Sequence, residues 1–510
     1  MKNLKLILFI HFMIIFFFTN AQNPSIEWQK CIGGSNNDDA YSIIQTADGG
    51  YITVGTATSN DFDVIENQGG STLFVVKLSN GGAIEWKKCI DGTGDVLSPK
   101  IIQNNRGGYT VSALNVSSII DFNAYVLELD SIGNIIWKKS YGGSDFDKLN
   151  SMIQTPDGGY LFVGNTSSND GDLQNLNFFP NNIGWIVKID SIGNIVWQKL
   201  IGGTGYDELF NVSHTSDNGY IIAGSSSSND GDVQENIWVD CAWIIKLNSI
   251  GIIQWHKCIG RDNFNKAKDV KQCFDGGYIV ACDKRPLYAD DRDGFIVKLS
   301  STGTIEWQKD IGGDRDDFFT SILETTDGGF IVGGTVRSYS GEIPLPYYGF
   351  EDCWIIKLST IGNIEWQKRF GGNDSDILYS LIPTIDNGFI FAGSTKSRYN
   401  DVIGLHTTGS YPFYSDMWIV KLSPTVSVDF FDFEETMNIY PNPTSNILNL
   451  QTERKFLNEP YQIFSTLGQV VAKGTINSEN TQIDVSSLGK GFYIIEIGNK
   501  TKSRQKFFKN

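Results

Sequence analysis

Residues 135–164 read IIWKKSYGGSDFDKLNSMIQTPDGGYLFVG, and similar stretches recur along most of the chain. Each copy begins with a tryptophan in a short apolar and basic context, such as IEWQK at residues 26–30 and IVWQK at residues 195–199. The recurring tryptophans are Trp28, Trp86, Trp137, Trp197, Trp255, Trp307 and Trp366. Their spacing of 51 to 60 residues indicates an internal repeat, which decides the fold before any other feature is considered.

Every copy has the same order of turns and apolar segments. In the third copy, turns are expected at residues 142–143 and 157–159, and strands at residues 152–155, 160–164 and 185–189. The segments are short and rich in β-branched and aromatic residues, which is typical of strands. Asp-Gly and Asn-Gly pairs supply the positive φ angles of tight hairpins. Four antiparallel strands in each repeat predict the blade of a β-propeller.

The two ends of the repeat array are complementary. Trp28 lies in a fourth strand that has no first three strands before it, and residues 418–422 form a third strand with no tryptophan strand after it. Pairing of these two strands closes the ring and leaves no open edge. The sequence therefore predicts an all-β fold, a seven-bladed β-propeller over residues 22–423 whose N-terminal strand closes the last blade. An open solenoid, or closure by residues 426–430, is the alternative.

The N-terminus has the pattern of a secretory signal peptide over residues 1–21. Lys2 and Lys5 precede an apolar run at residues 6–18, and Ala21 follows it. That run is too short to span a bilayer as a helix, although an uncleaved anchor is the alternative. We expect a mature monomer without a transmembrane segment, outside the cytoplasm. The formal net charge of −17 argues against nucleic acid as a partner.

Two recurring residue types are expected to be structural. Export permits disulfides, but the seven cysteines show no zinc-site spacing, and Cys31, Cys89 and Cys258 occupy equivalent positions in separate copies. We expect them to be small buried apolar residues. A lysine recurs in the third strand, and glutamates lie opposite it in three copies, which predicts exposed ion pairs worth less than about 1 kcal/mol each. The three glutamates are Glu85, Glu306 and Glu365.

The connections between strands differ at the two ends of the expected propeller. Hairpins at one end are nearly identical in every copy, whereas the loops at the other end, which we call the variable face, differ in length and chemistry. Loops on a rigid scaffold commonly carry binding sites. Aromatic residues in these loops are candidates to stack on a glycan or contact a protein, with packing of the loops on themselves as the alternative. They are Trp238, Tyr288, Tyr347, Tyr348, Tyr411, Phe413 and Tyr414.

Acidic residues also gather at the variable face. Ser-Asn-Asp-Gly-Asp occurs twice, at residues 168–172 and 228–232, and its oxygens suit Ca²⁺. This makes Asp170, Asp172, Asp230 and Asp232 candidate calcium ligands, with a solvated turn as the alternative. An aspartate ten residues after the tryptophan caps a turn or contributes to a cation-attracting ring. It recurs as Asp38, Asp147, Asp207, Asp317 and Asp376.

The last 75 residues have a different character. Tyr440-Pro441-Asn442-Pro443-Thr444 is followed by LGKGFYI at residues 488–494 and a basic end. This pattern resembles the C-terminal sorting domain of the bacterial type IX (Por) secretion system. The resemblance implies a small β-sandwich at residues 436–510, after a linker at residues 424–435, and passage across the outer membrane through the type IX machinery. In that case Tyr440, Pro441, Asn442, Pro443, Gly491 and Tyr493 belong to the sorting motif.

The function expected from these features is that of a secreted or cell-surface binding module whose ligand is a glycan or a protein. The chain has no G-x-S-x-G, H-E-x-x-H or P-loop motif, so no catalytic residue is assigned and no cofactor is expected apart from Ca²⁺. An extracellular hydrolase or lyase acting on polysaccharide, and a structural surface component, are the alternatives.

Overall fold

The computed structural model describes two compact units, one ending at residue 424 and one beginning at residue 437. The described residues are 23–67, 69–90, 95–118, 121–176, 181–234, 236–237, 239–286, 291–341, 343, 349–406, 414–424, 437–452, 454–465, 470–498 and 503–510. The expected signal peptide lies outside them, as does the expected linker apart from residue 424. None of the helices in the described segments is long and apolar enough to cross a bilayer.

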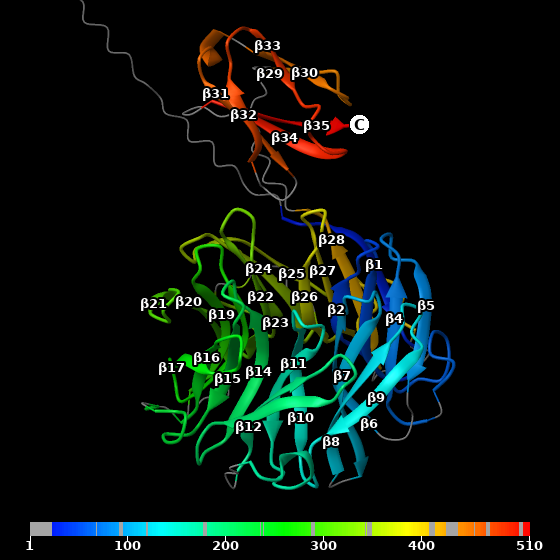
Figure 1. The fold of residues 1–510 in the computed structure, drawn as a ribbon. Helices are drawn as coiled ribbons and strands as arrows, with labels where there is room; N and C mark the ends of the chain where they lie inside the picture. Colours follow the sequence, from blue (N-terminus) through cyan, green and yellow to red (C-terminus); the bar gives the residue numbers. More distant parts are fainter. Residues whose placement is uncertain are drawn as a thin grey trace, which may run out of the picture. The chain divides into compact units, whose positions relative to one another are not determined.

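The first unit contains seven four-stranded antiparallel sheets within its described residues (Figure 1). Blade 1 consists of β2 (Asp38–Gln45), β3 (Tyr51–Ala57), β4 (Thr72–Leu78) and β5 (Ile84–Ile90). Blade 2 consists of β6 (Asp95–Gln103), β7 (Tyr109–Ser118), β8 (Asp121–Leu129) and β9 (Ile135–Tyr141). Blade 3 consists of β10 (Asp147–Gln154), β11 (Tyr160–Thr166), β12 (Ile183–Ile189) and β13 (Ile195–Ile201). Blade 4 consists of β14 (Asp207–His214), β15 (Tyr220–Ser226), β16 (Cys241–Leu247) and β17 (Ile253–Ile259). Blade 5 consists of β18 (Phe264–Gln272), β19 (Tyr278–Arg285), β20 (Asp293–Leu299) and β21 (Ile305–Ile311). Blade 6 consists of β22 (Asp317–Glu324), β23 (Phe330–Val336), β24 (Asp352–Leu358) and β25 (Ile364–Phe370).

The seventh blade joins the two ends of the array. It contains β26 (Asp376–Pro383), β27 (Phe389–Thr395), β28 (Asp416–Leu422) and the N-terminal β1 (Ile26–Ile32), which pairs antiparallel with β28. The innermost strand of each blade contacts that of the next blade, and β2 contacts β26, so the ring is closed. The predicted seven-bladed propeller with closure by the N-terminal strand is confirmed. The edge of β28 is occupied by β1, and residues 426–430, the alternative partner, lie outside the described residues.

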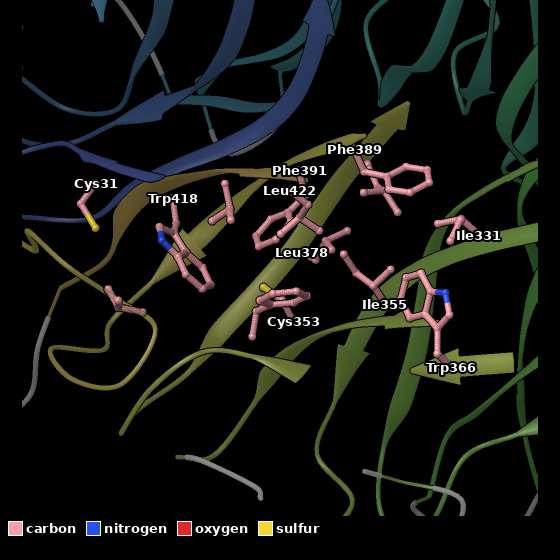
Figure 2. Packing of buried hydrophobic residues seen from close by; sticks show 14 residues of the cluster. Cys31, Ile331, Cys353, Ile355, Trp366, Leu378, Phe389, Phe391, Trp418 and Leu422 are labelled. Carbon is pink, nitrogen blue, oxygen red and sulfur yellow. The ribbon is translucent and has the colours of Figure 1, made fainter. Parts of the chain in front are cut away.

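The core lies between neighbouring blades, where side chains from facing sheets interdigitate. Figure 2 shows the cluster between blades 6 and 7, in which Leu378, Phe391 and Trp418 are fully buried. Burial of such side chains contributes roughly 1.5–3 kcal/mol each. The recurring tryptophans also lie between blades. A Cβ at Gly82, which has a φ of +78°, would come within 2.8 Å of Trp28 from the preceding blade.

The recurring lysines are buried, so the expectation of exposed pairs is wrong for them. The Lys77 side chain is 3% exposed, and its Nζ lies 3.0 Å from Asp48 Oδ2 and 3.1 Å from Glu85 Oε2. The predicted contacts with Glu85, Glu306 and Glu365 are present. The missed partner is the aspartate of the Asp-Gly-Gly or Asp-Asn-Gly turn. It recurs in the pairs Lys188–Asp157, Lys246–Asp217, Lys298–Asp275, Lys357–Asp327 and Lys421–Asp386.

One cysteine expectation is also wrong. Cys258 forms a disulfide with Cys241, and the two Cα atoms are 5.4 Å apart on the neighbouring strands β17 and β16. The repeat pattern hides this pair because Cys241 has no counterpart in the other copies. The expectation holds for Cys31, which is a buried free cysteine, whereas Cys89 is only half-buried.

The second unit is a β-sandwich of two sheets, with strand orders β29-β30-β33 and β32-β31-β34-β35. Its strands are β29 (Met437–Tyr440), β30 (Ile447–Thr452), β31 (Pro460–Ser465), β32 (Val470–Thr475), β33 (Asn480–Asp484), β34 (Gly491–Ile497) and β35 (Ser503–Lys509). Leu448 and Leu450 from one sheet share a buried core with Ile463, Ile495 and Phe507 from the other. Two short 3-10 helices, η1 (Gly171–Leu173) and η2 (Arg454–Phe456), complete the described elements of the chain.

Candidate binding site

The recurring aspartates at the start of the innermost strands are fully buried caps. Asp147 Oδ2 accepts hydrogen bonds from the Gly143 amide at 2.7 Å and the Ser168 hydroxyl at 2.8 Å, while Oδ1 accepts one from Thr166. Asp207 has the same arrangement. Because these carboxylates are 0% exposed, they hold the turn between blades and form no cation-attracting ring at the channel mouth.

Blade 5 departs from this pattern. It has Asn265 at the cap position, and Lys284 and Pro286 stand where blade 3 has the hydroxyl donors Thr166 and Ser168. Asn265 therefore satisfies the turn differently: Oδ1 accepts from the Arg261 amide at 2.9 Å, and Nδ2 donates to main-chain carbonyl oxygens. Blade 5 therefore lacks the buried carboxylate of the cap and has basic side chains on β18 and β19.

These basic side chains line a cavity of about 400 Å³ at blades 4 and 5. Its lining residues are Asp240, Phe264, Lys266, Lys268, Asp283, Lys284, Arg285 and Arg292. Phe264 begins β18, Arg285 ends β19, and Arg292 directly precedes β20, so the cavity opens where the variable loops emerge. Five cations and two carboxylates thus gather in one hollow of a chain whose formal net charge is −17.

Aromatic rings support the cations of this cavity, which we call the basic pocket. Arg285 lies 5.1 Å from the centroid of Phe264, Arg292 lies 5.9 Å from that of Phe318, and Lys268 Nζ lies 4.4 Å above Phe210. Contacts of this kind attract a cation without neutralising its charge. The guanidinium groups are therefore held in place while remaining available to a ligand.

The two carboxylates of the basic pocket are desolvated. Burial raises the pKa of Asp240, and the nearby Lys266 opposes that rise. Burial also raises the pKa of Asp283, with Lys268 Nζ 3.9 Å from its Oδ2 opposing the rise. Burial lowers the pKa of Lys268. A concave site that combines perturbed carboxylates with cations is a candidate functional site.

Of the aromatic residues predicted from the sequence, Tyr414 is described by the structure, and it does not line the basic pocket. Tyr414 is 45% exposed and precedes β28 of blade 7, away from blades 4 and 5. The remaining predicted residues, Trp238, Tyr288, Tyr347, Tyr348, Tyr411 and Phe413, lie outside the described residues. In sequence, Trp238 stands two residues before Asp240, and Tyr288 stands between Arg285 and Arg292. These aromatic assignments stay predictions.

The candidate calcium ligands accept hydrogen bonds from the main chain. Asp170 Oδ1 lies 2.7 Å from the Ser144 amide nitrogen, and Asp172 Oδ2 lies 3.1 Å from that of Gly142. Asp230 and Asp232 repeat both contacts in blade 4. Within the described segments, no group of three or more His, Cys, Asp or Glu is arranged to hold a metal ion. Calcium binding stays a prediction, tested by the melting temperature with and without Ca²⁺.

The basic pocket was missed by sequence reasoning although a signal for it exists. Residues 264–272 read FNKAKDVKQ, whereas the corresponding strand of blade 6 reads DFFTSILE. Comparing the innermost strands position by position would have singled out blade 5. The acidic net charge of the whole chain concealed this local excess of lysine.

The residues of the expected sorting motif surround the last strand of the β-sandwich. Asn442 Oδ1 accepts a hydrogen bond from the Phe508 amide at 2.9 Å, between Pro441 and Pro443, and Tyr440 is 44% exposed. Gly491 begins β34, and the Tyr493 ring stacks on Phe507 at 5.7 Å. These contacts tie the Tyr-Pro-Asn-Pro loop to β35.

The chain is thus a seven-bladed β-propeller followed by a β-sandwich. Residues 438–510 match the family model of the secretion system C-terminal sorting domain. This match shows that the chain carries a Por secretion tail, which implies export by the type IX secretion system to the cell surface or the extracellular space. No curated protein matches this chain in sequence.

Several solved structures are similar to this chain at low identity. A protein of unknown function from Dyadobacter fermentans DSM 18053 is 11% identical, with a TM-score of 0.44 over 79% of this chain and 99% of that chain. The Neurospora crassa Pan2 WD40 domain is 9% identical, with a TM-score of 0.39 over 76% and 97%. The GH93 α-L-arabinofuranosidase of Fusarium graminearum, in complex with arabinobiose, is 10% identical, with a TM-score of 0.38 over 78% and 98%. Similarities at this level say nothing about the activity of this chain.

Proposed function

We propose that this protein is an exported binding module that captures an extracellular ligand at the variable face of its propeller. Residues 1–21 act as a signal peptide, residues 22–423 form the binding domain, and residues 424–435 link it to the sorting domain at residues 436–510. The signal peptide serves passage across the inner membrane, and the sorting domain serves passage across the outer membrane.

The observation that carries this proposal is the basic pocket. The opposite end of the propeller repeats the same hairpin contacts in successive blades. For example, Gln103 accepts a hydrogen bond from Ala47 at 2.8 Å, and Gln154 accepts one from Asn105 at 2.9 Å. At the variable face, blade 5 lacks the capping aspartate of the repeat, and its charged side chains line a cavity. Blade 2 also lacks the capping aspartate, with Val96 at that position, but blade 5 combines this loss with a concave site lined by charged side chains, which favours ligand binding there.

A polysaccharide hydrolase or lyase is the second candidate, favoured by Asp240 and Asp283. Both carboxyl groups line the same cavity, and glycosidic-bond cleavage uses a pair of carboxyl groups, one as proton donor and one in its ionised form. The two candidates differ in product formation, because a binding module leaves the polysaccharide intact.

The test exposes the mature full-length protein to arrays of glycans and to soluble polysaccharides. We expect retention on the array with no release of reducing ends or unsaturated products. Product release abolished in Asp240→Asn or Asp283→Asn would replace the binding module with the enzyme. Absence of every interaction with glycans and surface proteins would overturn both candidates.

A further inference from the structure

We infer that the basic pocket recognises an acidic sugar residue, with the sugar carboxylate at the guanidinium groups and its hydroxyls at the pocket carboxylates. This inference rests on the proposed binding function and specifies its ligand class. The carrying observation is the juxtaposition of Arg285 and Arg292 with Asp240 and Asp283 around one cavity.

The cations of the pocket select for an anionic group. The lysines of the pocket already face carboxylates, since Lys266 Nζ lies 3.1 Å from Glu208 and Lys284 Nζ lies 3.5 Å from Asp310. Arg285 and Arg292 are therefore the cations that an anionic ligand would meet. Arginine binds carboxylates through paired, charge-assisted hydrogen bonds in a fixed planar geometry. Cation–π contacts of Arg285 with Phe264 and of Arg292 with Phe318 restrict both guanidinium groups before the ligand arrives, which reduces the entropy cost of binding.

The carboxylates of the pocket select for hydroxyl donors beside the anionic group. Asp240 and Asp283 are hydrogen-bond acceptors when ionised, and they repel a ligand that carries only negative charge. An acidic peptide or an inorganic anion offers such charge with few hydroxyl donors. A uronic acid residue offers one carboxylate and several hydroxyls on a compact ring, which matches both halves of the pocket.

The size of the cavity fits a single sugar unit or a short segment. About 400 Å³ lies within the range of sites that hold small organic ligands, roughly 300–1,000 Å³. The charges converge on one hollow and do not form a stripe across the propeller. The shared chemistry is a uronate, either as a free sugar acid or as a residue within a polysaccharide.

The test measures binding of the mature full-length protein by isothermal titration calorimetry. The probes are trisaccharides of galacturonate, mannuronate and glucuronate-containing hyaluronan, the methyl ester of the galacturonate trisaccharide, free galacturonic acid and poly-L-glutamate. We expect at least one uronate trisaccharide to bind, with affinity that falls as NaCl rises. For galacturonate, we expect the ester to bind at least tenfold more weakly than the acid. Free acid that binds as tightly as the trisaccharide identifies a sugar-acid ligand, and weaker binding of the free acid identifies a polysaccharide.

The matched variants are Arg285→Gln with Arg292→Gln, and Lys396→Gln. Lys396 occupies in blade 7 the position that Arg285 occupies in blade 5, so it controls for loss of a cation at the same place in the repeat. We expect at least tenfold weaker uronate binding in the double variant and unchanged binding in Lys396→Gln. If the double variant does not fold, recognition of the sugar carboxylate is tested by the acid-to-ester comparison and by the salt dependence of binding to the unaltered protein.

Three results would overturn the inference: no uronate probe binds, the ester binds as well as its acid, or poly-L-glutamate binds as tightly as the best uronate. A neutral glycan whose binding is lost in the double variant would keep the proposed binding function while rejecting the acidic ligand. Release of products from a uronate polysaccharide would support the acidic sugar as the ligand class and would reject the proposed non-catalytic binding function.

Discussion

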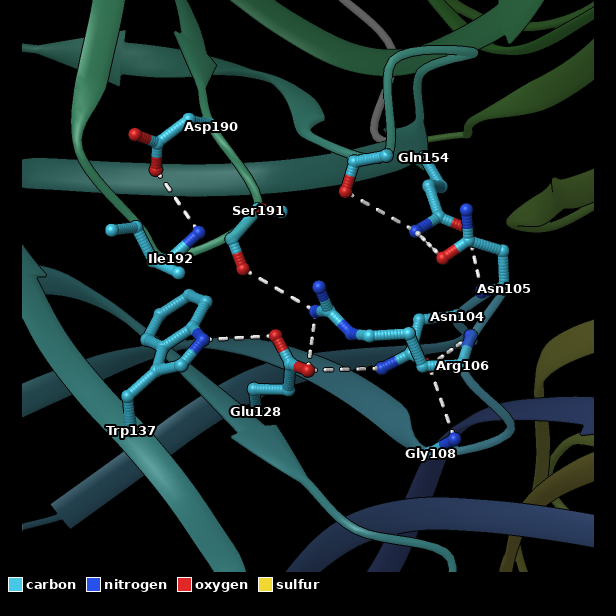
Figure 3. A network of polar contacts seen from close by, with 11 residues as sticks. Asn104, Asn105, Arg106, Gly108, Glu128, Trp137, Gln154, Asp190, Ser191 and Ile192 are labelled. Atoms are coloured by element: carbon cyan, nitrogen blue, oxygen red, sulfur yellow. Dashed lines mark hydrogen bonds and ion pairs between the residues drawn. The ribbon is translucent and has the colours of Figure 1, made fainter.

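Arg106 and Glu128 form an ion pair in blade 2 that is the charge reversal of the pair found in the other six blades. Figure 3 shows that Glu128 also accepts a hydrogen bond from Trp137 Nε1, at 2.9 Å. Asn104 Oδ1 accepts the Gly108 amide at 3.0 Å, which replaces the contact that Asp48 makes in blade 1. The site between hairpin and third strand therefore requires two opposite charges, and either arrangement satisfies it.

Replacing Glu128 with lysine should destabilise the propeller strongly. The Glu128 side chain is 2% exposed, so Glu128→Lys buries a cation beside Arg106 with no partner. We expect a loss of about 3 kcal/mol in the free energy of unfolding. Urea unfolding followed by tryptophan fluorescence measures it, because all twelve tryptophans lie before residue 419 and report on the propeller.

The matched control restores the opposite charge. Arg106→Asp combined with Glu128→Lys recreates the pair present in blade 1, and it should recover most of the lost stability. Recovery remains incomplete because lysine does not accept the hydrogen bond from Trp137. A double variant no more stable than Glu128→Lys alone would show that the pairing of opposite charges is not what holds this hairpin.

Closure of the ring by β1 makes the N-terminal strand essential. Ile32 is fully buried between blades 7 and 1, and Ile132, at a hairpin tip, is 60% exposed. We expect Ile32→Ala to cost about 2–4 kcal/mol and Ile132→Ala less than about 0.5 kcal/mol. Deletion of residues 22–32 should lower the melting temperature and cause association through the free edge of β28. A shortened protein that is equally stable and monomeric by light scattering would contradict closure.

Much of the fold can be predicted from the residues of the local turns. Asp157 and the two glycines after it define a hairpin, and the strand expected at residues 160–164 is observed as Tyr160–Thr166. The innermost strand was expected at residues 152–155 but begins at Asp147. Its first half carries few apolar residues, and its place in the sheet depends on the buried cap that Asp147 forms with donors about twenty residues away.

The candidate site depends on contacts that the repeat pattern does not encode. Lys77 looked exposed because its partner Asp48 lies 29 residues earlier, in another turn. The basic pocket requires Asp240 from blade 4 to lie beside residues of blade 5, and the packing of these two blades places them together. Similar turn motifs predict architecture well because all seven blades have a glycine-containing turn at the same place. The different sequence of blade 5 indicates a binding site only when the residues that lie beside it in the structure are known.

The disulfide between Cys241 and Cys258 should form in the exported protein. We expect the mature chain to have five free thiols of its seven cysteines, counted by alkylation and mass spectrometry. The bond encloses a separation of 17 residues, so Cys241→Ala with Cys258→Ala should cost about 2–3 kcal/mol. Cys89→Ser, at a half-buried free cysteine, is the control that removes one thiol without removing a bond. Seven reactive thiols in the native protein would refute the pairing.

The buried caps should make the propeller more stable in mild acid than in mild alkali. Burial raises the pKa of Asp376 to about 7, and the nearby Asp352 adds to this rise, while hydrogen bonds from Thr395, Ser397 and Gly372 oppose it. The folded state therefore holds a proton that the unfolded state, with the ordinary value of 3.8, releases. Stability consequently falls as pH rises from about 4 to about 7, by on the order of 2–4 kcal/mol for this group.

The variant Asp376→Asn removes this titration, and blade 5 already accommodates asparagine at the equivalent cap, Asn265. We expect a shallower dependence of the free energy of unfolding on pH between about 4.5 and 7.5 in this variant. Asp291→Asn, at an exposed aspartate, should keep the slope of the unaltered protein. Because the pKa of the cap Asp38 is also raised, to about 6, part of the slope should persist in Asp376→Asn. An unchanged slope in Asp376→Asn would show that the buried cap stays ionised throughout this range.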